Sequence, residues 1–90
     1  MEIRFHTLVA AFPHQPEFNA SIVLPNDYVE LDALWREQKI AVELDSRTFH
    51  LTQAAFERNR RLFIATGIHT IRLTDAQMDE GVRDLRKLVA

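Results

Sequence analysis

The sequence predicts an α/β domain, a mixed sheet flanked by helices with the elements in the order α-β-β-β-α-β-α. Two neighbouring segments alternate apolar and polar residues and are separated by one short polar connection. A capped helical segment follows them, and a third alternating segment follows that helix. Because a helix between consecutive strands favours a crossover, we expect a parallel strand beside an antiparallel hairpin.

The first half of the chain predicts a short helix and three strands. Residues 3–12 carry apolar side chains at helical positions and end before Pro13, while residues 20–24 are a short apolar strand. Residues 28–35 and 39–45 alternate with a period of two, which predicts the antiparallel hairpin. Their connection, R-E-Q-K, lacks Asn-Gly chemistry, so we expect a four-residue loop.

The second half predicts two helices around one strand. Residues 52–66 form the first helix, with Thr52 as its N-cap and Gly67 as its C-terminal stop. Residues 68–73 alternate as a strand. The segment T-D-A-Q then predicts a capping box, in which the threonine caps the backbone of the last helix. The apolar positions of that helix are Met78, Val82, Leu85 and Val89.

The bulk composition indicates one globular domain over residues 1–90. The chain is 47% hydrophobic and 27% charged, which is ordinary for a folded protein. It has no cysteine, and this excludes disulfides, thiolate metal sites and a cysteine nucleophile. There is no apolar stretch of membrane-spanning length and no signal-peptide pattern at the start, so we expect a cytoplasmic protein.

The charges are segregated along the chain, although the formal net charge is only −2. From residue 27 to residue 45 there are six acidic residues against two basic ones, whereas from residue 47 to residue 61 there are four arginines against one glutamate. An acidic block followed by a basic one suits a metal site beside a phosphate-binding surface. The alternative is an acidic hairpin next to a solvated basic helix.

The hairpin register predicts a cluster of three carboxylates. If Trp35 pairs with Ile40, the apolar side chains of both strands gather on one face. The same register places Asp32 opposite Glu43, with Cβ atoms about 4.5–5.5 Å apart. Asp45 lies two residues beyond Glu43 and shares its face.

Carboxylates placed so close repel one another unless they are solvated, protonated or share a cation. Mg²⁺, with Mn²⁺ as a second candidate, prefers such oxygen ligands and can activate water for attack on a phosphate. We therefore treat Asp32, Glu43 and Asp45 as candidate metal-binding and catalytic residues. The alternative is that they line the solvated face of an antiparallel sheet.

Further candidate residues follow the hairpin. His50 could transfer protons beside the metal, although a histidine at a helix start also serves as a cap or surface residue. Four arginines are candidates for binding DNA phosphates: Arg47, Arg58, Arg60 and Arg61. Helical geometry turns Arg60 about 100° away from Arg61, so these four side chains cannot all face one ligand.

Two stretches resemble a known family. The segment E-L-D-A-L-W-R-E-Q-K-I-A-V-E-L-D-S-R-T-F-H and the following T-Q-A-A-F-E-R-N-R-R are similar to a family of bacterial domains of unknown function. That family is related to the very-short-patch-repair (Vsr) endonucleases of the PD-(D/E)XK nuclease superfamily. Its pattern has an Asp in the first hairpin strand, E-V-D-G in the second, a His shortly afterwards and an F-E-R-D-R-R helix. The resemblance covers roughly residues 8–90.

The resemblance implies a restriction-endonuclease-like fold and metal-dependent hydrolysis of DNA. Asp32, Glu43 and Asp45 match the family's proposed metal-binding carboxylates, His50 matches its histidine, and Arg58 falls in its arginine-rich helix. Because members often end a longer chain, the resemblance also allows this chain to be the C-terminal part of a larger protein, with a partner domain or a second copy.

Several positions depart from the family pattern. Ser46 stands where the family has Gly, Asn59 replaces an Asp, and Phe63 replaces a second Asp. Asp45 occupies the superfamily's lysine position, as it does in the family itself. Three hypotheses follow: a Mg²⁺-dependent DNA endonuclease or nickase, a catalytically inactive endonuclease-like module that binds DNA or a protein, and a purely structural α/β domain.

Overall fold

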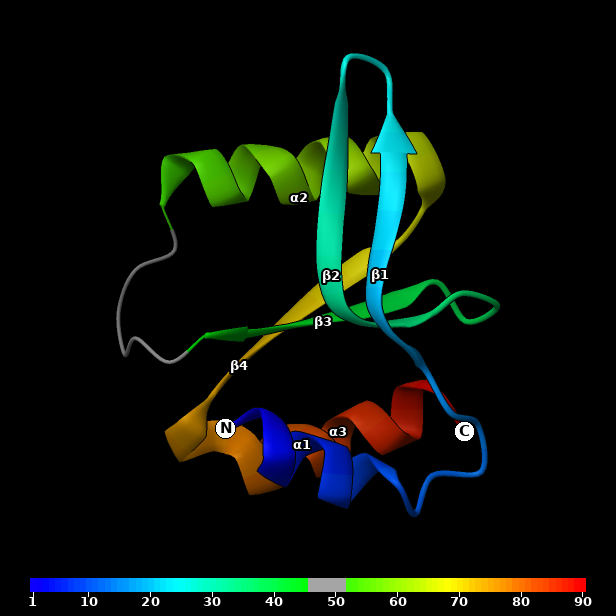
Figure 1. The fold of residues 1–90 in the computed structure, drawn as a ribbon, viewed down its shortest axis with the longest axis vertical. Coiled ribbons are helices and arrows are strands. Elements are labelled where there is room, and N and C mark those ends of the chain that lie inside the picture. Colours follow the sequence, from blue (N-terminus) through cyan, green and yellow to red (C-terminus); the bar gives the residue numbers. More distant parts are fainter. Residues whose placement is uncertain (46–51) are drawn as a thin grey trace.

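The computed structural model describes residues 1–45 and 52–90 and confirms the mixed α/β class (Figure 1). Its elements are α1 (Glu2–Val9), β1 (Glu17–Leu24), β2 (Asp27–Trp35), β3 (Ile40–Asp45), α2 (Gln53–Thr66), β4 (His69–Thr74), the 3₁₀ turn η1 (Asp75–Gln77) and α3 (Met78–Leu88). In these two ranges they comprise three α-helices and one four-stranded sheet. No helix among the described residues is long and apolar enough to cross a membrane.

The sheet has the strand order β1-β2-β3-β4 and is mixed, as the crossover predicts. The β1–β2 and β2–β3 pairs are antiparallel, and β4 runs parallel to β3. Trp35 pairs with Ile40 and Ala33 with Val42, so the predicted hairpin register is confirmed. The register is determined by burial, because a slip of one residue would turn the apolar side chains of β3 to the opposite face.

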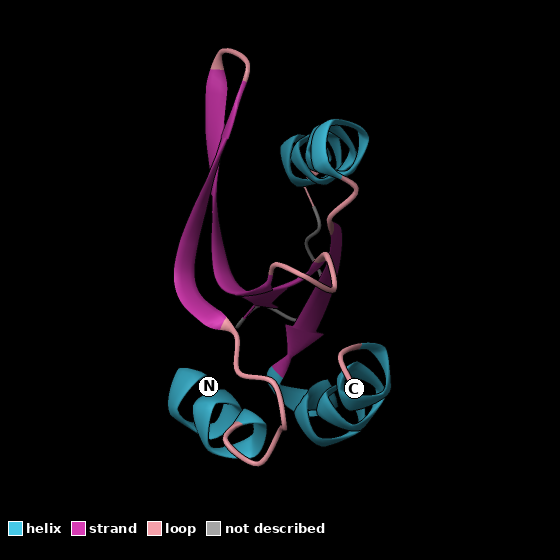
Figure 2. Cartoon of the chain, turned by 90° about the vertical axis from the view of Figure 1, so that its right-hand side faces the viewer, coloured by secondary structure: helices cyan, strands magenta, loops and turns pink. Residues whose placement is uncertain are grey.

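Helices cover both faces of the sheet, and each face has its own apolar core (Figure 2). On one face, α1 and α3 pack on side chains that include Trp35 and Val42. On the other, Leu62 of α2 packs on Ala41 and on the β1–β2 hairpin, which rises along one side of the molecule. Because side chains alternate along a strand, Glu43 shares the α2 face with Ala41.

The ends of α2 follow the predicted chemistry. The Thr52 hydroxyl accepts the backbone N–H of Ala55 at 3.1 Å and caps the first turn. At the other end, Gly67 has a φ of 76°, and its N–H donates to the Phe63 carbonyl at 2.7 Å. A left-handed residue that closes the last turn is the role in which glycine is favoured.

Three predicted details differ in the structure. The first helix ends at Val9 rather than at residue 12, and β1 begins at Glu17 rather than at residue 20. Local spacing does not show this extra pairing, because the additional residues form part of β1 only through their contact with β2. The threonine of the predicted capping box, Thr74, donates its hydroxyl to the Gln77 side chain instead of capping the backbone, and the helix proper starts after a 3₁₀ turn.

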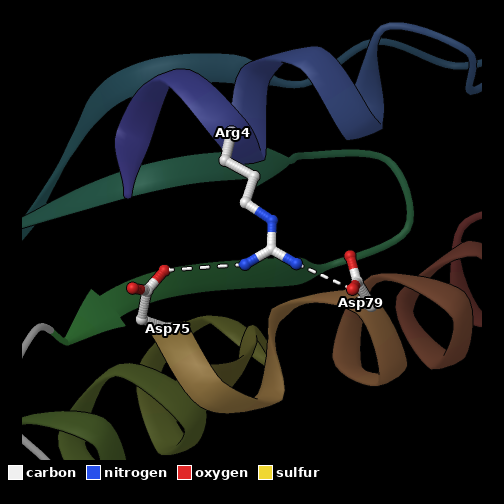
Figure 3. Close-up of polar contacts among 3 residues, drawn as sticks. All are labelled: Arg4, Asp75 and Asp79. Carbon is white, nitrogen blue, oxygen red and sulfur yellow. Dashed lines mark hydrogen bonds and ion pairs between the residues drawn. The ribbon is translucent and has the colours of Figure 1, made fainter.

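Polar contacts link the two helices on the α1/α3 face (Figure 3). The Arg4 guanidinium of α1 lies 2.7 Å from the carboxylate of Asp79 in α3 and 3.8 Å from that of Asp75 in η1. All three side chains are exposed, so such pairs contribute little to stability and the apolar core carries the packing. The contacts link α1 to η1 and to the first turn of α3.

Candidate functional site

Asp32 and Glu43 come together across the β2–β3 hairpin through backbone hydrogen bonds. The N–H of Asp32 donates to Glu43 Oε1 at 3.2 Å, and the N–H of Leu44 donates to Asp32 Oδ2 at 2.7 Å. Both side chains are half-buried on the α2 face. Each carboxylate is therefore held against the strand that carries the other, which fixes the orientation of both groups.

These two carboxylates form part of the wall of a cavity of about 730 Å³ between the β1–β2 hairpin, β3 and α2. The lining residues are Asn19, Asp27, Tyr28, Glu30, Leu31, Asp32, Glu43 and Arg58. We call this hollow the acidic cavity, because four of its lining residues are carboxylic acids and only one is an arginine. Its walls expose more polar than apolar surface, so it suits a charged ligand better than an apolar one.

The electrostatic environment of Glu43 reflects this crowding. Burial is the main cause that raises the pKa of the Glu43 carboxyl, and the negative charge of Asp32 raises it further. The hydrogen bond from the Asp32 backbone and the positive charges of Arg72 and Arg58 oppose this rise. The net direction is upward, so the protein disfavours the ionised form of Glu43 when no other cation is close.

Arg72 is a site residue that the sequence reasoning missed. It lies on β4 directly beside Glu43 in the parallel register, on the same face of the sheet. Its Nε and Nη2 atoms and the Thr70 hydroxyl oxygen are buried, and none of them has a hydrogen-bond partner among the residues that the structure describes. The positive charge of Arg72 is close enough to Glu43 to oppose the rise in the pKa of that carboxyl.

The predicted arginines separate. Arg58 lines the acidic cavity. Arg61 lies three residues further along α2 and forms an ion pair of 3.3 Å with Asp27 at the start of β2. Arg60 is exposed. Arg47 and His50 lie outside the described residues.

The third predicted carboxylate, Asp45, lies two residues beyond Glu43 on β3. Asp45 ends β3, pairs with Thr74 of β4 and does not line the acidic cavity. Among the residues that the structure describes, no group of three or more His, Asp or Glu side chains is arranged to hold a metal ion. The arrangement thus consists of two convergent carboxylates, with the role of Asp45 remaining a prediction from the sequence.

The donor set of Asp32 and Glu43 fits a hard divalent cation. One oxygen of each carboxylate accepts a backbone N–H, and no described residue donates a hydrogen bond to the other oxygen, Asp32 Oδ1 or Glu43 Oε2. Mg²⁺ is commonly held in proteins by one or two carboxylates together with several water molecules. The two oxygens supply that number of protein ligands.

Comparison with known proteins adds no relative: no protein-family model, curated protein or solved structure matches this chain. The resemblance to the Vsr-related domains therefore stays a prediction from the sequence motifs. The fold and the acidic cavity stand on the structure itself, independently of that similarity.

Proposed function

We propose that this domain is a metal-dependent DNA endonuclease or nickase that hydrolyses phosphodiester bonds in the acidic cavity. The observation that supports this most is that Asp32 and Glu43 line one cavity together with Arg58. The carboxylates of Asp32 and Glu43 each accept a backbone N–H there. Paired carboxylates beside an arginine are what phosphodiester chemistry needs: ligands for a cation and a donor for phosphate oxygens. The sequence resemblance points to the same chemistry.

The charge of the cavity argues for a cation. Four carboxylates and one arginine line it, so a phosphodiester would be repelled from the walls as they stand. A divalent ion between Asp32 and Glu43 would offset the burial and the repulsion by Asp32 that raise the pKa of Glu43. When bound, Mg²⁺ or Mn²⁺ would lower the pKa of a bound water and stabilise negative charge on the phosphate.

The chain's own residues have separate roles in this proposal. Asp32 and Glu43 would hold the cation, and the backbone hydrogen bonds orient their two carboxylates. Arg58 donates to the phosphate oxygens and orients the DNA backbone. Roles for Asp45, His50 and Arg47 follow from the sequence alone, as a further ligand, a proton-transfer group and a phosphate contact.

One observation favours the second candidate, a catalytically inactive endonuclease-like module that binds DNA or a protein. Arg72 and Arg58 already place two positive charges near Glu43. In such a module the two arginine side chains would take the place of the metal ion, and the acidic cavity would have no catalytic role. The two candidates differ in one property, which is metal-dependent cleavage.

The test is nicking of supercoiled plasmid DNA by the purified protein with Mg²⁺ or Mn²⁺, with excess chelator as the blank. The variants are Glu43→Gln and, as a charge-matched control, Glu37→Gln in the exposed β2–β3 loop. We expect cleavage by the wild type and the control, and a loss of more than about a hundredfold in Glu43→Gln, because even the hydrogen-bond partners of metal ligands cost about 10–100-fold when they are mutated. Equal cleavage by Glu43→Gln overturns the proposal, and DNA binding without cleavage supports the inactive module.

A further inference from the structure

We propose that a second hollow beside the acidic cavity binds the base of an unpaired nucleotide, so that the substrate is single-stranded or locally unpaired DNA. This side pocket has a volume of about 250 Å³ and lies between the turn of the β1–β2 hairpin and the C-terminal half of α2. Its lining residues are Leu24, Pro25, Asp27, Arg61, Ile64 and Ala65. The inference rests on the proposed function for the neighbouring cavity, and it names the substrate class.

The side pocket and the acidic cavity are adjacent. Asp27 lines both of them, and Tyr28, the next residue, lines the cavity and is 60% exposed. The base and the phosphate of one nucleotide are joined through its sugar, so a ligand that occupies both hollows must have its apolar and its anionic parts next to each other. A nucleotide has that form.

Helix α2 gives each hollow one arginine. Arg58 and Arg61 are three residues apart, so they share one stripe of the helix. Arg58 lines the acidic cavity and Arg61 lines the side pocket. The stripe thus carries one positive charge for a phosphate and a second guanidinium at the edge of the pocket, and this favours a nucleic acid over an apolar peptide.

The chemistry of the side pocket suits a base. Leu24, Pro25, Ile64 and Ala65 provide apolar walls, and the volume is below the roughly 300–1,000 Å³ of pockets for larger ligands. The polar groups are the Arg61 guanidinium, which donates, and the Asp27 carboxylate, which accepts, held 3.3 Å apart. The edge of an unpaired base offers both donors and acceptors, and its face packs on apolar or guanidinium surfaces.

A base within a duplex could not enter. Its faces are stacked and its edge is paired, so only an unpaired or extruded base can present both to a pocket. Ile64 is 77% exposed at this site although it is one of the largest apolar side chains of α2. Covering it with a base would remove that apolar surface from water, a gain that intact duplex cannot provide.

The test is binding of a short fluorescent single-stranded oligodeoxynucleotide, followed by anisotropy with chelator and again with Ca²⁺, a hard cation that takes similar oxygen ligands. Ala65→Leu fills the side pocket. The matched control is Ala54→Leu, at another exposed alanine of α2 that lines neither hollow. We expect Ala65→Leu to weaken binding about tenfold, as the loss of one base contact does, and Ala54→Leu to leave it unchanged.

Two further ligands sharpen the result. Replacing the bases of the oligonucleotide by abasic sites should weaken binding to the wild type and leave Ala65→Leu little affected, and the matching duplex should bind more weakly than the single strand. Equal binding by Ala65→Leu and the wild type, tighter binding of the duplex, or no binding of the oligonucleotide by the wild type overturns the inference. Circular dichroism and the fluorescence of Trp35, the single tryptophan, verify that each variant is folded.

The plasmid assay separates this inference from the proposed function. If the wild type binds the oligonucleotide through the side pocket but never cleaves DNA, the base site stands and the nuclease proposal fails. If the wild type cleaves and Ala65→Leu binds the oligonucleotide as tightly as the wild type, the nuclease proposal stands and the base site fails.

Discussion

Glu43 accepts the backbone N–H of Asp32 at 3.2 Å, which ties the carboxylate of one strand to the backbone of the other at the point where both side chains reach the acidic cavity. The reciprocal contact, from the Leu44 N–H to Asp32 Oδ2 at 2.7 Å, completes the brace. Two carboxylates that repel each other are thus held in place, because each accepts a backbone N–H of the opposite strand. The site is organised before any ligand arrives, which lowers the entropic cost of binding one.

The first prediction concerns pH and stability. The pKa of Glu43 is raised in the folded protein, mainly by burial, so the folded state holds this proton more tightly than the unfolded state. Ionisation of Glu43 therefore lowers the free energy of unfolding. This loss is absent below the usual carboxyl pKa of 4.5, grows as the pH rises from 4.5 to the raised pKa of the folded protein, and stays constant above it. Glu43→Gln keeps an acceptor for the Asp32 N–H and removes the charge.

Chemical unfolding at a series of pH values, without divalent metal, measures this effect. We expect Glu43→Gln to be more stable than the wild type at neutral pH and the difference to shrink as the pH falls through that window. The exposed control Glu37→Gln should show no such trend. A variant that is less stable than the wild type at neutral pH would contradict the argument.

The second prediction concerns Arg72. Its positive charge opposes the rise in the pKa of Glu43, so Arg72→Met should move the titration of the Glu43 carboxyl to higher pH. Arg72→Lys should restore part of the difference, because a lysine carries the charge without the guanidinium. Carbon-13 NMR of the side-chain carboxyl follows the titration, with Arg60→Met as the exposed control. No change in Arg72→Met would remove Arg72 from the site.

The third prediction tests the packing of α3 on β4. A Cβ on Gly81 would overlap Leu73 Cδ2, so the helix and the strand approach closely there because the residue is glycine. Gly81→Ala costs about 1–3 kcal/mol of overpacking against a gain of roughly 1 kcal/mol in helix propensity, so the free energy of unfolding should fall by up to about 2 kcal/mol. With Leu73→Ala in the same chain the overlap disappears, and Gly81→Ala should then be stabilising. Urea unfolding of the four proteins gives both differences.

The fourth prediction compares two helix starts. The Thr52 hydroxyl caps the backbone of α2, whereas the Thr74 hydroxyl bonds only to the side chain of Gln77. Thr52→Ala should lower the free energy of unfolding by about 1 kcal/mol, and Thr74→Ala by clearly less. Thermal and urea unfolding of both variants measure the contrast. Equal losses would mean that the cap at Thr52 is not the source of its contribution.

The hairpin could be predicted from the sequence because one face of it is buried. Trp35, Ala33 and Val42 must all reach the α1/α3 core, and only one register achieves this. That register predicts Asp32 opposite Glu43, and the hydrogen bonds across the hairpin confirm that the two residues lie together. The caps of α2 were equally predictable, because Thr52 and Gly67 act through local chemistry.

Arg72 could not be predicted in the same way. Its position beside Glu43 depends on the parallel register of β4, which is set by the crossover through α2 and not by any local pattern. The two hollows likewise depend on how the β1–β2 hairpin packs against α2. No local sequence pattern therefore predicts the ion pair between Asp27 and Arg61. Tertiary packing determines these contacts.

The central claim is that Asp32 and Glu43 form a divalent-cation site, and titration calorimetry tests it most directly. Mg²⁺ and Mn²⁺ are titrated into the metal-free wild type, Asp32→Asn and the exposed control Glu37→Gln. The account predicts saturable binding in the wild type and the control, and its loss in Asp32→Asn. Metal should also raise the stability of the wild type and leave the stability of Asp32→Asn unchanged. Binding that is unchanged in Asp32→Asn, or absent from the wild type both alone and with an oligonucleotide present, would contradict it.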